Sequence, residues 1–110
     1  MEEKKGYLKA VGIDKSFKMK TNHGSVVAEI YDLEGLKAAI EKAPGEAILF
    51  HMDNRNDFAA WIGGVVSCST LSEVVQKIEP NHSNVEHTRN QLLETLDLGI
   101  KIIKEIQKQG

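Results

Sequence analysis

The C-terminal segment, roughly Asn84 to Lys108, has the apolar spacing of one long helix with an unusually wide hydrophobic face. Positions four and three residues apart form a seam along this helix: Leu92, Leu96, Gly99, Ile103 and Ile106. Further apolar positions widen the arc: Leu93, Leu98, Ile100 and Ile102. The seam is expected to pack on the domain. The leftover residues predict a homodimer or another protein partner through this helix, unless the domain itself covers both sides of the arc.

The composition of the chain argues against several classes of fold and function. The chain has 110 residues, of which 41% are hydrophobic and 27% charged, and this suits one ordinary globular domain spanning residues 1–110. Its net charge of −2 argues against a protein that binds nucleic acid by neutralising phosphates. No apolar run is long enough to span a membrane, and the N-terminus lacks the apolar stretch of a signal peptide, so we expect a cytoplasmic protein without membrane contact.

The N-terminal part of the chain has the pattern of a β-hairpin. Ser16 to Lys20 alternates apolar and lysine residues, as a strand with one buried face does. Asn22-His23-Gly24 has turn chemistry, and Ser25 to Tyr31 is rich in β-branched residues.

Two segments follow, of which only the first has a clear pattern. Asp32 is a good N-cap for a helix from Leu33 to Ala43, which Pro44-Gly45 should end. Ala47 to Met52 is a short apolar run, and its pattern fits a buried strand as well as a buried helix.

Three further helix starts are marked by capping residues. The first lies at Asn56 or Asp57, and its helix should weaken at Gly63-Gly64. The second is a capping box at Thr70 that opens a helix ended by Pro80. The third, Ser83 to Glu86, opens the long helix. The sequence therefore predicts an α+β fold, with an N-terminal β-hairpin, about four helices and a long C-terminal helix.

The densest group of polar residues surrounds the helix start at Asn56 or Asp57. The residues that could form a small-ligand or metal site are these: His51, Asp53, Asn54, Asn56, Asp57 and the neighbouring Trp61. Their spacing matches no standard metal motif, so the alternative is a helix-capping loop that needs no ligand. We predict no catalytic residue, no metal ligand and no cofactor. Cys68, the single cysteine, is expected to be a packing residue.

The run from His51 to Ile62 resembles a motif, H-x4-N-D-F-x2-W-I, of a family of uncharacterised, largely archaeal domains of unknown function. The matching positions are His51, Asn56, Asp57, Phe58, Trp61 and Ile62. The resemblance implies a shared structural nucleus around these residues and a mostly helical core, but no reaction. The family's acidic residue before its next helix is replaced here by the run that begins at Cys68.

Two functions remain open from the sequence. The first is a non-enzymatic interaction or regulatory module, which is suggested by the wide apolar face of the last helix. The alternative is a small-ligand or metal-binding site, possibly enzymatic, around the polar cluster from His51 to Asp57.

Overall fold

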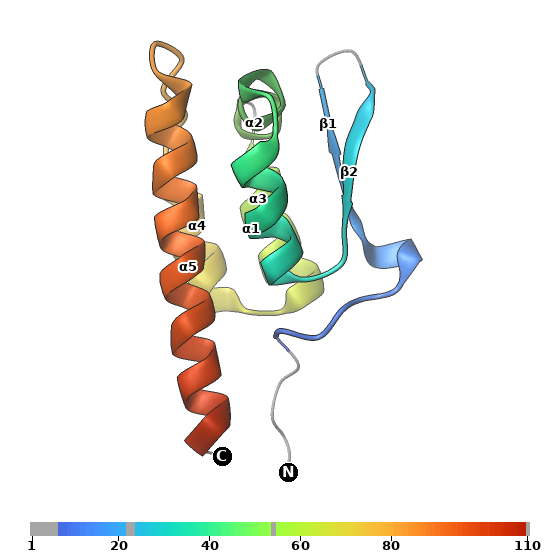
Figure 1. Cartoon of the computed structure of the whole chain (residues 1–110), viewed down its shortest axis with the longest axis vertical. Coiled ribbons are helices and arrows are strands. Elements are labelled where there is room, and N and C mark those ends of the chain that lie inside the picture. The colour runs from blue at the N-terminus through green and yellow to red at the C-terminus, as the bar shows by residue number, and fades with distance from the viewer. Residues whose placement is uncertain (1–6, 22–23, 54, 110) are drawn as a thin grey trace.

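The computed structural model describes residues 7–21, 24–53 and 55–109 and shows a β-hairpin followed by helices (Figure 1). Within these residues the elements are as follows: β1 (Phe17–Lys20), β2 (Val26–Ile30), α1 (Leu33–Lys42), α2 (Gly45–Met52), α3 (Asp57–Trp61), α4 (Ser69–Gln76) and α5 (Val85–Gln109). A 3-10 turn at Ile13–Lys15 precedes β1, and a π-helical segment at Ile62–Val66 follows α3. The predicted α+β fold is confirmed, and the described residues form five α-helices where about four were predicted.

The hairpin is antiparallel and presents one face to the core. Phe17 pairs with Ile30 and Met19 with Ala28. Phe17 and Met19 are buried while Lys18 and Lys20, which alternate with them, are exposed, as the alternation predicted. The Asn22-His23 part of the predicted turn lies outside the described residues. Gly24 has a φ of 84°, a conformation that glycine adopts without steric cost.

Helices α1 and α2 lie between the hairpin and α5 (Figure 1). The Asp32 carboxylate accepts the backbone N–H of Gly35 at 2.7 Å, which confirms the predicted N-cap of α1. The run from Ala47 to Met52 is helical. Its buried residues, Ala47, Ile48, His51 and Met52, recur at helical spacing, so this segment meets the core with one face of a helix.

The chain between α3 and α4 departs from the predicted pattern. After α3 the helix widens into the π segment, which contains Gly63 and Gly64, and it ends at Ser67, whose φ is 69°. α4 then begins at once, with Cys68 in the N-cap position and Thr70 inside the first turn. The predicted capping box at Thr70 is therefore wrong, because the left-handed turn at Ser67 lets the next helix begin earlier. α4 also ends at Gln76, before Pro80 is reached.

Helix α5 is the longest element of the described residues and packs against α1, α2 and α4. At about 37 Å for 25 residues, it runs along most of the 44 Å long axis. The predicted capping box at Ser83 is wrong: the Asn84 side chain accepts the backbone N–H of His87 at 3.3 Å, and Glu86 pairs with Arg89.

The seam that α5 buries differs from the predicted seam at its C-terminal end. Leu92, Leu96 and Ile103 are buried, as expected, but Ile100 is buried and Ile106 is 63% exposed. Figure 1 shows that the last turns of α5 extend beyond the N-terminal end of α1. No helix within the described residues is long and apolar enough to cross a membrane.

Candidate functional site

An apolar hollow runs between α4 and α5, and we call it the α4–α5 groove. It encloses about 360 Å³. Its lining residues come from both helices and from the N-terminal segment: Tyr7, Cys68, Ser69, Thr70, Leu71, Val74, Thr95, Leu98, Gly99, Ile102, Ile103 and Ile106. Apart from hydroxyl groups and one thiol, these side chains offer only apolar surface.

The groove gathers apolar side chains that soluble domains usually hide. Eight large apolar residues are strongly exposed in the described part of the chain, and four of them line this groove. Leu98 is 60% exposed, Ile102 50% and Ile106 63% on α5, and Val74 is 48% exposed on α4. Scattered exposed apolar residues are ordinary, but a contiguous apolar patch of this kind marks an interaction surface.

The floor of the groove is formed by a close approach of its two helices. A Cβ atom on Gly99 would lie 2.8 Å from Cδ1 of Leu71, so the glycine is what lets the buried Leu71 reach α5. α4 has only eight residues and α5 has 25, so α4 covers only a short stretch of the longer helix. The apolar stripe from Leu98 to Ile106 is left open for this reason.

The predicted polar cluster is organised around a buried histidine. The His51 ring is 4% exposed and lies beside Phe17, Phe50 and Phe58, with ring centroids 4.9 to 5.6 Å away. Its Nε2 accepts the backbone N–H of Lys20 at 2.8 Å. Nδ1 therefore carries the ring proton of the neutral imidazole and donates it to Oδ2 of Asp57 at 2.9 Å. His51 thus ties the end of β1 to the beginning of α3.

The other residues of the predicted cluster are bonded within the fold. Asn56 caps α3 by accepting the N–H of Ala59 at 3.0 Å, and it donates from Nδ2 to the carbonyl of Val75 at 2.9 Å. The indole N–H of Trp61 donates to the carbonyl of Lys15 at 2.9 Å. Asn54 lies outside the described residues.

Asp53 is separated from this buried network. Its carboxylate lies 2.9 Å from Nε2 of His82, and both side chains are exposed. The structure thus brings together His51, Asp57 and Asn56 around the start of α3, and it places Asp53 in a second, exposed pair. Across the described residues, no three His, Cys, Asp or Glu side chains form a group suited to a metal ion. This geometry favours a structural role for His51, and the predicted binding role of the cluster stays a prediction.

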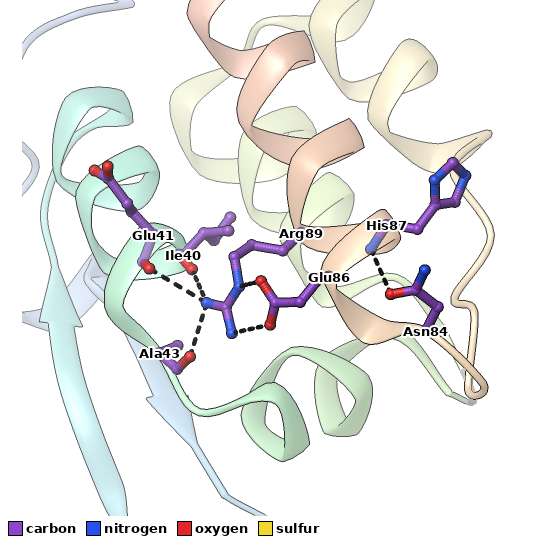
Figure 2. Close-up of polar contacts among 7 residues, drawn as sticks. All are labelled: Ile40, Glu41, Ala43, Asn84, Glu86, His87 and Arg89. Carbon is purple, nitrogen blue, oxygen red and sulfur yellow. Dashed lines mark hydrogen bonds and ion pairs between the residues drawn. The ribbon is translucent and has the colours of Figure 1, made fainter.

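Arg89 is a central polar residue that the sequence did not single out (Figure 2). From the first turns of α5, its NH1 donates to the carbonyls of Ile40 at 2.6 Å and Ala43 at 2.8 Å, and more weakly to that of Glu41. Glu86 holds the guanidinium from the other side through two hydrogen bonds of 2.8 and 3.0 Å. Arg89 therefore caps the C-terminus of α1, whose last carbonyls have no partner within the helix.

Ion pairs join α1 to the side of α5 away from α4, and one further pair on that side lies within α5. Lys37 bonds to Asp97 at 2.8 Å, Lys101 to Asp97 at 3.1 Å and Lys104 to Glu34 at 3.2 Å. The hydrogen bond from Lys37, followed by that from Lys101, lowers the pKa of the Asp97 carboxyl below its ordinary value. The same contact with Asp97 raises the pKa of the Lys37 ammonium.

A family model described as a family of unknown function (DUF5752) matches residues 28–109. The chain belongs to this family. The match covers most of the chain and includes the five described α-helices, the polar cluster and the groove residues of α4 and α5, but not Tyr7. β1 precedes the matched region, so the Lys20 N–H that binds His51 comes from outside it. No curated protein and no solved structure matches the chain.

Proposed function

We propose that this protein is a non-enzymatic interaction module and that the α4–α5 groove binds an amphipathic helix of a protein partner. The observation that carries the proposal is the concentration of exposed Leu98, Ile102, Ile106 and Val74 in one groove. A helix-in-groove complex places apolar residues of the bound helix, spaced three and four apart, into such a surface.

The chemistry of the groove supports a protein ligand over a polar metabolite. Small-molecule sites combine apolar walls with several converging polar groups. Here the polar groups that line the groove are hydroxyls and the thiol of Cys68, and no charged side chain is among its lining residues. A bound apolar face would gain from the removal of water without having to bury a charge.

The alternative role at His51 has weaker support. Both ring nitrogens of His51 are engaged, one by the Lys20 backbone and one by Asp57, so neither is directed at open space. A ligand or metal ion would have to displace one of these hydrogen bonds.

The proposal is tested with a fluorescently labelled model helix that carries leucine on one face and alanine and glutamine elsewhere. Fluorescence anisotropy should report binding to the wild-type protein. Ile102→Glu should weaken that binding at least about tenfold, because the complex would bury an unpaired carboxylate. The matched control is Phe50→Glu, since Phe50 is 41% exposed on α2 and does not line the groove.

The expected pattern is loss of binding for Ile102→Glu and retention for Phe50→Glu. Equal binding by both variants, or no binding by the wild-type protein at a concentration at which it is monomeric, contradicts the proposal. Circular dichroism of both variants checks that the fold is intact.

A further inference from the structure

We infer that the occupant of the α4–α5 groove is α5 of a second copy of this chain, in an antiparallel arrangement with a two-fold axis near Ile102. This inference rests on the proposed function and specifies the partner. It is carried by the symmetry of the exposed stripe and by the charges along its edge.

The exposed stripe is symmetric about its central residue. Leu98, Ile102 and Ile106 are spaced by four residues and are all half-exposed or more. A two-fold axis at Ile102 brings it against itself and sets Leu98 of each copy against Ile106 of the other. A closed two-fold dimer requires self-complementarity of this kind, because each patch must fit its own copy.

The charges beside the stripe are complementary under the same axis. At 100° per residue, Lys101 and Glu105 lie on the same side of the stripe, the side away from Leu71 and α4. The midpoint between Lys101 and Glu105 is position 103, one residue from the axis at Ile102. The axis therefore places Lys101 of each copy close to Glu105 of the other copy, which gives two equivalent pairs. A parallel arrangement would place Lys101 and Glu105 of the two copies on opposite sides of the interface, and this pairing would be lost.

The groove gives the second helix a place to lie. Each α5 would occupy the hollow between α4 and α5 of the other copy and cover Val74 as well as the stripe. The resulting layer of α4, α5 and their two symmetry mates buries the apolar surface of both copies at once. The strand-edge residues and Phe50 stay outside this layer.

Disulfide trapping tests the contact and its direction. Ile102→Cys should cross-link to itself under a mild oxidant, because the axis brings the two copies of this position within disulfide reach. Leu98→Cys alone should not cross-link, but an equimolar mixture with Ile106→Cys should give the heterodimer, which is identified by a tag on one chain. Wild-type protein, which contains only the buried Cys68, and Phe50→Cys are the controls.

Light scattering over a range of concentrations supplies the second readout. The wild-type protein should approach the dimer mass as concentration rises, and Ile102→Glu should stay monomeric. Lys101→Glu and Glu105→Lys should each raise the dimer Kd roughly tenfold, and the double variant should restore it to within about twofold. The thermal midpoint of each variant, measured at monomeric concentration, separates this effect from changes within the helix.

A strict monomer that still binds the model helix overturns the inference and leaves the proposed function standing. A strict monomer that does not bind the helix overturns both. A dimer in which Ile102→Cys fails to cross-link overturns the inference, because its interface lies elsewhere.

Discussion

His51 connects three elements through one buried ring. Its two nitrogens bind the Lys20 backbone N–H and the Asp57 carboxylate, and aromatic side chains from β1, α2 and α3 surround it. A buried donor that loses its acceptor costs more than the net value of one hydrogen bond. The ring also fills space that a smaller side chain would leave empty.

We therefore predict that His51→Ala lowers the free energy of unfolding by about 3 kcal/mol, from the cavity and the lost hydrogen bonds together. Urea unfolding followed by Trp61 fluorescence measures this. The exposed His87→Ala serves as the control and should change stability by less than about 0.5 kcal/mol. Full stability of His51→Ala, together with a divalent cation that raises the thermal midpoint of the wild-type protein only, would favour the binding role.

Arg89 is a second residue that joins two elements, here the C-terminus of α1 and the first turns of α5. Its guanidinium is the shared partner of α1 carbonyls and of Glu86, and its side chain is only 13% exposed. A lysine cannot reproduce this contact, because the ammonium lacks the planar fork that binds two groups at once.

We predict that Arg89→Ala lowers the free energy of unfolding by about 2–3 kcal/mol and that Arg89→Lys recovers only part of the loss. Arg55→Ala is the matched control, since Arg55 is 84% exposed and pairs at the surface. Amide hydrogen exchange should show faster exchange at the end of α1 in Arg89→Ala. A loss no larger than that of Arg55→Ala would refute the capping role.

At the scale of elements, the contact between α1 and α5 depends on the ionised carboxylate of Asp97. The lowered pKa of Asp97 means that the folded state favours its carboxylate form more than the unfolded state does. The resulting stabilisation is complete above the unfolded pKa, about 3.9 for an aspartate. It is lost as the pH falls from that value through the pKa of the folded state.

Comparison of the wild-type protein with Asp97→Asn should show this dependence. The stability difference between the two should be constant from neutral pH down to about pH 5 and then shrink on further acidification. An NMR titration of the Asp97 carboxyl carbon should give a midpoint below that of a free aspartate. A midpoint at or above the free value would show that Lys37 and Lys101 do not hold the carboxylate in solution.

Elements with local signals could be predicted from the sequence. The alternation around Met19, the Asp32 cap and the start of α3 depend on residues close in the chain, and all three are found. The capping boxes at Thr70 and Ser83 failed because each helix begins at a different residue from the one that the box predicts. There, the left-handed turn at Ser67 and the Asn84 side chain decide where each helix begins.

Other features depend on partners far along the chain. Arg89 and the carbonyls it binds are at least 46 residues apart, and no short motif announces such a contact. The apolar arc of α5 was predicted, but which of its residues are buried depends on how far α1 and α4 extend along it, and there Ile100 is buried while Ile106 is 63% exposed. For the candidate site, the sequence predicted Leu98 and Ile102 as apolar residues outside the packed seam, but it placed Ile106 in that seam and did not predict the α4 wall that makes the stripe a groove.

At the scale of the whole molecule, α5 divides two functions between its two sides. One side packs in the core, where Leu92, Leu96 and Ile100 are nearly or fully buried against the other helices. The other side carries the exposed stripe of the groove. A core residue on this helix supports the packing of α1, α2 and α4 together, so its loss should be felt by the entire fold.

Two substitutions two residues apart test this division. Leu96→Ala, at a residue only 1% exposed, should lower the free energy of unfolding by about 3 kcal/mol, a large part of the roughly 5–15 kcal/mol typical of a domain. Leu98→Ala, at a residue 60% exposed, should change it by less than about 0.5 kcal/mol when measured at monomeric concentration. Urea unfolding by circular dichroism and by Trp61 fluorescence should give coincident transitions for both variants, because the core is continuous along α5.

In the groove assays the order of the two effects should reverse: Leu98→Ala should weaken helix binding and dimerisation, and folded Leu96→Ala should keep both. Two separate transitions, or equal costs for the two substitutions, would mean that α5 does not join the helices into one cooperative unit.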